Sequence, residues 1–249
     1  MSNLNTDDDK SWQNPYIPTQ EKMGLTWLIA AAITTVFLWQ IPWGNYILYP
    51  FTILATWFHE MGHGLTAILL GGNFQKLLIY PNGSGIASHS GAVILGPLGR
   101  ALVAAGGPMG PPIAGAALIL ASRSFKTARL GLLFIGSLLL ISTLIWVRSI
   151  FGIIAIPLLG LIILGIALKT PTWVQGFTVQ FLGVQACIST FHQINYLFIN
   201  SVIINGNKIY SDSGQIAQEL LLPYWFWGGL MAIASILLLI QSLRLAYKN

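Results

Sequence analysis

The chain has 249 residues, of which 55% are hydrophobic and 8% carry a charge, and its mean hydropathy is +0.71. This composition is typical of a polytopic membrane protein; about seven spans of ~20 residues leave no room for a sizeable soluble domain. The net charge of +5 does not indicate a nucleic-acid partner, because the Lys and Arg residues lie singly along the chain and form no basic stripe.

The N-terminal segment, residues 1–23, is polar and contains Asp7, Asp8 and Asp9, so we interpret it as a tail and not as a cleavable signal. Residues 24–249 are expected to form one transmembrane domain. The expected fold class is all-α, with about seven transmembrane helices, a short hairpin at the membrane face and one helix broken by Gly and Pro. Apolar runs predict these helices at residues 25–43, 46–70, 96–121, 129–147, 150–168, 173–199 and 216–243.

The second predicted helix carries the motif His59-Glu60-Met61-Gly62-His63 near its middle. His59 and His63 are four residues apart, so their side chains project from one helical face and can share a metal ion. Two imidazoles at this spacing suit Zn²⁺, which would lower the pKa of a bound water, while Glu60 would take the proton of that water as general base. Chance produces such a motif in about one chain of this composition per thousand.

The lipid environment strengthens this interpretation. An ionised group at the centre of a bilayer costs about 2.5–3.5 kcal/mol on insertion scales, so Glu60 requires either a partner or a function. The alternative, two core histidines beside a buried glutamate, is therefore weaker here than it would be in a soluble helix. We expect a hydrolytic zinc site within the membrane.

Two segments rich in turn residues follow the motif. An alternating run that starts at Leu77 precedes the turn 81–85, which predicts a small β-hairpin over residues 77–87. The run 106–112, Gly-Gly-Pro-Met-Gly-Pro-Pro, predicts a break in the third helix. Such a break survives in lipid only where protein or a polar cavity covers the freed backbone groups, and we expect that cavity to be the active site. A packing kink that lets two helices approach through small residues is the alternative.

A catalytic zinc ion usually has three protein ligands, so one more side chain must join the two motif histidines. Asp212 is our choice, because it stands at the start of the seventh predicted helix, on the membrane side where the motif helix ends. Its alternative role is a helix N-cap. Glu219, one turn into the same helix, ranks second, and His89 and His192 are the imidazole alternatives.

A polar cluster that includes His192 and Asn195 lies inside the sixth predicted helix. Because polar groups are costly in lipid, we expect this cluster to face the site, where it would contact the substrate or stabilise the oxyanion. The one cysteine, Cys187, lies in an apolar segment and is interpreted as a packing residue.

These residues resemble the small branch of the site-two-protease family, the M50B-like zinc intramembrane metalloproteases that lack PDZ domains. The resemblance implies that His59, His63 and Asp212 bind Zn²⁺ and that Glu60 is the catalytic acid and base. The asparagine-proline and aspartate-glycine motif of the larger members is absent in that form. Five features carry the resemblance: residues 59–63, Gly71-Gly72, the stretch 79–85, the run 106–112 and Ser211-Asp212.

The same resemblance implies an activity and its partners. The protein would cleave peptide bonds within or near transmembrane segments of membrane-protein substrates, surrounded by lipid, in a bacterial cell membrane or a plastid-type membrane. A helical segment must unwind before cleavage, and the hairpin would hold it as an added strand. The alternatives are a catalytically silent scaffold of the same fold and a metal-ion transporter, since transporters also place histidines and acids in mid-membrane.

Overall fold

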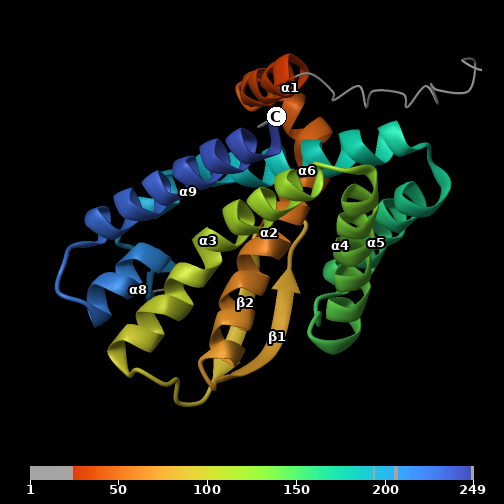
Figure 1. The fold of residues 1–249 in the computed structure, drawn as a ribbon. Coiled ribbons are helices and arrows are strands. Elements are labelled where there is room, and N and C mark those ends of the chain that lie inside the picture. The colour runs from red at the N-terminus through yellow and green to blue at the C-terminus, as the bar shows by residue number, and fades with distance from the viewer. Residues whose placement is uncertain (1–24, 193, 205–206, 248–249) are drawn as a thin grey trace, which may run out of the picture.

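The computed structural model describes residues 25–192, 194–204 and 207–247, so the expected tail, residues 1–23, lies outside the described residues. Helices dominate, accompanied by two short antiparallel hairpins (Figure 1). In chain order the elements are α1 Leu25–Leu38, α2 Gly44–Leu69, β1 Asn73–Ile79, β2 Gly85–Ser90, α3 Pro97–Ala121, α4 Phe125–Ile145, α5 Ile150–Lys169, α6 Thr172–His192, α7 Ile194–Leu197, β3 Ser201–Ile204, β4 Asn207–Tyr210, α8 Asp212–Glu219 and α9 Tyr224–Tyr247.

The described part of the chain contains four helices that are long and apolar enough to cross a membrane, namely α3, α4, α5 and α9. Helices α2 and α6 have 26 and 21 residues but do not belong to this set. The first carries the ionisable motif, and the second buries three glutamines, Gln175, Gln180 and Gln185. The expectation of a mostly helical membrane protein is thus confirmed, whereas the expectation of seven spans is not.

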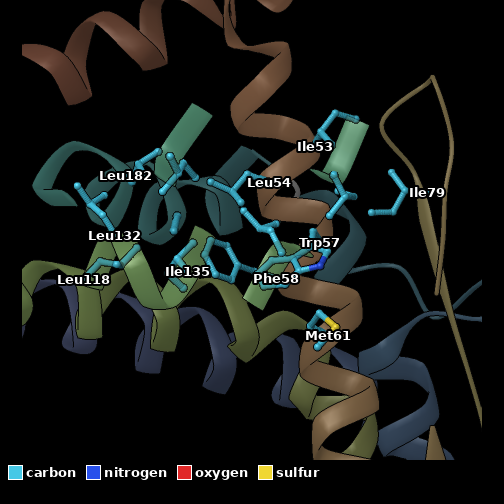
Figure 2. Close-up of a cluster of buried hydrophobic side chains, with 14 of the residues drawn as sticks. Ile53, Leu54, Trp57, Phe58, Met61, Ile79, Leu118, Leu132, Ile135 and Leu182 are labelled. Atoms are coloured by element: carbon cyan, nitrogen blue, oxygen red, sulfur yellow. The ribbon is translucent and has the colours of Figure 1, made fainter. Parts of the chain in front are cut away.

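Helix α2 runs through the middle of the molecule, with α3 crossing it and the α4–α5 pair to one side (Figure 1). Trp57, Phe58 and Met61 project from α2 into the main core, where they meet side chains of α3, α4 and α6 (Figure 2). The Trp57 indole donates a hydrogen bond to Ser142 Oγ at 3.0 Å, which ties α2 to α4. The motif therefore lies on a helix whose middle part packs into the main core.

The predicted break in the third helix is wrong, because α3 continues through the run 106–112. The glycines of this run allow α3 to touch α2 backbone to backbone. A Cβ atom on Gly62 would lie 2.1 Å from the Gly106 carbonyl oxygen, and one on Gly110 would lie 2.3 Å from that of Phe58. Small residues spaced in this way are typical of close helix crossings in membranes. The alternative interpretation, approach through small residues, describes this crossing correctly.

The predicted hairpin is confirmed as the antiparallel pair β1–β2, in which Leu77 lies opposite Ala87. The outer edge of β1 is occupied, because the Leu77 amide donates to the Trp146 carbonyl at 2.8 Å and the Arg148 amide donates to the Leu77 carbonyl at 2.9 Å. Among the described residues no further strand pairs with β2. The hairpin consequently offers its free edge on the β2 side.

The second hairpin, β3–β4, falls in a segment that the sequence analysis left without structure. Its signal was present, since the β-branched run 202–204 precedes Asn-Gly in the sequence, a combination that favours a tight hairpin. The sixth predicted helix also ends earlier than expected, at His192, and the short helix α7 follows it.

The seventh predicted helix is wrong as a single element, because α8 ends at Glu219 and α9 begins at Tyr224. Pro223 lies between them. Proline disfavours the helical conformation in the residue before it and supplies no amide proton, so a helix ends before it more readily than it continues. Asp212 therefore belongs to a short helix of eight residues and not to a membrane span.

Candidate metal centre

The structure brings His59, His63 and Asp212 together. His59 Nε2 lies 3.1 Å from Asp212 Oδ2, and His63 Nε2 lies 3.3 Å from Asp212 Oδ1. The two imidazole nitrogens are 3.2 Å apart. One ligand atom from each of the three residues lies within 4.8 Å of the others, which is the arrangement that a single metal ion requires.

The chemistry of these atoms fits a cation. His63 Nδ1 lies 2.8 Å from the Val103 carbonyl oxygen, and because a carbonyl can only accept, Nδ1 carries the proton and Nε2 presents a lone pair to the site. Asp212 Oδ2 is buried and accepts no hydrogen bond from any described residue, despite its proximity to His59. A Cβ atom on Gly107 would lie 2.1 Å from His63 Nε2, so the glycine preserves space beside this nitrogen.

The start of α8 holds Asp212 in place. Ser211 is the N-cap of α8 and accepts a hydrogen bond from the Gly214 amide at 3.1 Å, so the alternative role of Asp212 as N-cap is wrong. Ser213 donates to the Leu197 carbonyl at 2.7 Å, which fixes α8 to the end of α7. Because its neighbours make the cap and the anchor, the Asp212 carboxylate, only 3% exposed, is left to face the two histidines.

Glu60 lies on a different face of α2 from the histidines and packs against the β1–β2 turn. Its side chain is buried. A Cβ atom on Gly85 would lie 2.6 Å from Glu60 Cγ and 2.9 Å from Oε1. One helical turn earlier, the Thr56 hydroxyl donates to the Gly83 carbonyl at 2.6 Å. The hairpin therefore confines the carboxylate next to the three ligands.

The structure does not bring Glu219 to the motif histidines. Its carboxylate accepts two hydrogen bonds from the Arg100 guanidinium, at 2.7 and 2.6 Å, which joins the end of α8 to the start of α3. These bonds hold the pKa of Glu219 below its usual range. Of the acids in the described chain, Asp212 alone joins the His59–His63 group.

The imidazole alternatives lie elsewhere. His192 stacks on Trp39 with 4.5 Å between ring centroids, and Asn195 is exposed on α7. His89 lies on β2 and lines a cavity of about 570 Å³ between β2, the start of α3 and α8. Neither histidine belongs to the cluster of potential ligands within the described residues.

Sequence reasoning missed Tyr196, whose ring lies 6.5 Å from that of His59 in an edge-to-face arrangement. Its only signal was its place beside Asn195 in the polar cluster. The cluster indeed approaches the site, but through this aromatic residue. Cys187 is buried between α6 and α3, as expected of a packing residue.

The fold and this geometry define a class: a helical integral membrane protein with a candidate metal centre of two imidazoles and one carboxylate. A family model described as Peptidase M50B-like matches residues 28–242, and the chain therefore belongs to the peptidase M50B-like family. The predicted membership is confirmed, and it suggests a metalloprotease of a group that generally depends on zinc. No curated protein and no solved structure matches the chain.

Proposed function

We propose that this protein is an intramembrane zinc metalloprotease that hydrolyses peptide bonds within or near the transmembrane segments of membrane-protein substrates. The observation that carries the proposal is the convergence of His59, His63 and Asp212 beside the buried carboxylate of Glu60, in a member of a metalloprotease family. Zn²⁺ bound by these three residues would polarise the scissile carbonyl and make a water molecule acidic enough to attack it.

Glu60 is the proton carrier in this proposal. It takes a proton from the attacking water and returns it to the nitrogen of the leaving amine, and both transfers require the carboxylate to stay within hydrogen-bonding distance of the reacting atoms. The contact with Gly85 supports this role, because it leaves the carboxylate little room to turn away from the ligands.

The substrate would approach through the cavity of about 570 Å³ between β2, α3 and α8. A peptide bond in a helix is shielded by its neighbours and its carbonyl is already hydrogen-bonded, so the segment must first unwind. The free edge of β2 supports the proposal that the unwound segment pairs there as an added strand, close to Glu60. A bacterial cell membrane or a plastid-type membrane is the proposed location.

Zinc content and peptide cleavage, measured on the same purified protein in lipid nanodiscs, test the proposal. A synthetic transmembrane peptide with helix-destabilising residues serves as substrate. We expect Glu60→Gln to retain about one zinc per chain and to lose about 10²–10⁴-fold in kcat, while His59→Ala loses the metal. Cleavage by Glu60→Gln at the wild-type rate contradicts the mechanism. Zinc binding without turnover favours the scaffold, and zinc flux into proteoliposomes favours the transporter.

A further inference from the structure

A small cavity lies against His59, between α2, α3, α6 and α7. Its lining includes Pro108, Thr190 and Tyr196. The centre of a water molecule can reach about 20 Å³ of it, which is room for about one water-sized group. A single oxygen atom of a substrate therefore fits in this space beside a candidate metal ligand.

The lining of this cavity contains a polar atom without a partner. The Thr190 hydroxyl is buried and has no hydrogen-bond partner among the described residues. A buried polar group that stays unpaired is costly, and such groups commonly mark a place where water or a ligand binds.

Tyr196 is the member of this lining that is best placed to act on a substrate. It lines the same cavity as His59, and its ring lies 6.5 Å from that of His59 in an edge-to-face arrangement, which places Tyr196 beside a candidate metal ligand. A neutral phenol carries one proton that it can donate in a hydrogen bond. The side chain is 37% exposed, and a substrate can reach it.

We infer that Tyr196 is a catalytic residue that donates a hydrogen bond to the oxygen of the scissile carbonyl as water adds to the carbon. This inference rests on the proposed function. The water oxygen forms a bond to the carbonyl carbon, Glu60 takes the water proton, and the electron pair of the carbonyl π bond moves onto the oxygen that faces Tyr196. The phenol keeps its proton throughout, and the pair returns when the bond to nitrogen breaks.

Tyr196 takes over the role that was expected of His192 and Asn195. His192 is engaged with Trp39, and neither residue lines the cavity beside His59. A donor aimed at the developing oxyanion acts mainly in the transition state, and removal of one such donor from other hydrolases lowers kcat by about 10²–10³-fold.

The test compares Tyr196→Phe with Tyr247→Phe. Tyr247 lies at the end of α9, outside the group of candidate metal ligands, and its hydroxyl accepts a hydrogen bond from Gln180 of α6. We expect Tyr196→Phe to lose about 10²-fold or more in kcat, with zinc content and KM close to wild type, while Tyr247→Phe keeps its kcat. A phosphinate peptide, which mimics the tetrahedral oxyanion, should bind Tyr196→Phe more weakly by a similar factor. The affinity for the substrate peptide is measured on the background of Glu60→Gln, which does not cleave it. The single variant Glu60→Gln and the double variant Glu60→Gln, Tyr196→Phe should bind this peptide with equal affinity.

Three outcomes overturn the inference: an unchanged kcat, loss of zinc from Tyr196→Phe, or equal weakening of the phosphinate and the substrate peptide. The last two would mean that the phenol supports the metal centre or the bound substrate without acting on the oxyanion. A wild-type protein that binds zinc but cleaves no peptide contradicts the proposed function itself, and that result is separate from any property of Tyr196→Phe.

Discussion

Two faces of α2 hold the candidate catalytic residues in different ways. Toward α3, Gly62 makes direct backbone contact, and no atom can be added without displacing a helix. Toward the β1–β2 hairpin, the contacts are hydrogen bonds from side chains: the Tyr49 hydroxyl donates to the Pro81 carbonyl and the Thr56 hydroxyl to that of Gly83, both at 2.6 Å. The comparison indicates that backbone contact with α3 positions the metal ligands, whereas a turn that side-chain hydrogen bonds hold against α2 confines the general base through Gly85.

The largest effect is expected from Gly107→Ala on the α3 face. The new Cβ would lie 2.1 Å from His63 Nε2, so the imidazole must leave its position. Alanine is a better helix former than glycine, by about 1 kcal/mol, and the substitution therefore does not break α3 itself. We expect zinc content after dialysis to fall to background and cleavage to disappear with it.

Gly165→Ala on α5 is the matched control, because a Cβ at this position meets no atom within 4 Å. It should keep both zinc and activity. If Gly107→Ala retains one zinc per chain, contact with α3 does not position His63. That result would contradict the proposed difference between the two faces of α2.

The next largest effect is expected from Gly85→Ala on the hairpin face. Its Cβ would lie 2.6 Å from Glu60 Cγ and 2.7 Å from Thr56 Cγ2, so the carboxylate must rotate or the strand must withdraw. We expect kcat to fall by about 10²-fold, as for a general base moved from its place, with zinc content unchanged. Ser88→Ala, in the same strand, should remain active. Loss of zinc from Gly85→Ala would show that the two faces are not independent.

A moderate effect is expected from Thr56→Val, which keeps the shape of the side chain and removes its hydroxyl. The buried carbonyl of Gly83 then loses a partner, which costs about 1–3 kcal/mol. For a chain of this size that loss lowers Tm by about 2–4 °C per kcal/mol, measurable by thermal unfolding in detergent. Activity should fall less than in Gly85→Ala, because nothing pushes the Glu60 carboxylate. If the kcat of Thr56→Val is as low as that of Gly85→Ala, the hydrogen bond from Thr56 to Gly83 positions the Glu60 carboxylate.

The sequence predicted local features of this site better than features that depend on distant contacts. His59 and His63 share a face because of helical periodicity alone. The turn rich in Asn and Gly predicted the first hairpin. Asp212 was chosen by elimination among few acids, and its approach to the histidines depends on the β3–β4 hairpin and on the separation of α8 from α9.

Contacts between segments far apart in the chain could not be read in this way. The run 106–112 contains three prolines and was expected to break a helix, because local rules weigh each proline alone. Packing of its glycines against Gly62 outweighs them. Gly85 was predicted as a turn residue, but its contact with Glu60 was not, and neither was the contact of Tyr196 with His59, since both contacts join segments far apart in the chain.

The smallest effect is expected from Arg100→Gln, which removes the ion pair between α3 and the end of α8. The pair is exposed, and the bonds of Ser211 and Ser213 at the other end of α8 already fix Asp212. Zinc affinity should change by less than about threefold, the scale of a weak surface pair.

The pH dependence separates this pair from the metal centre. The pKa of Glu219 is depressed in the folded protein, so the contribution of the pair to stability is present above the ordinary carboxylate pKa near 4.5 and is lost as the pH falls through the folded value. Wild type and Arg100→Gln should therefore differ in thermal unfolding at neutral pH and converge in acid. If Arg100→Gln instead releases zinc as Gly107→Ala does, the distal end of α8 positions Asp212. Sterics would then govern the two histidines, and an ion pair 119 residues apart in sequence would govern the carboxylate.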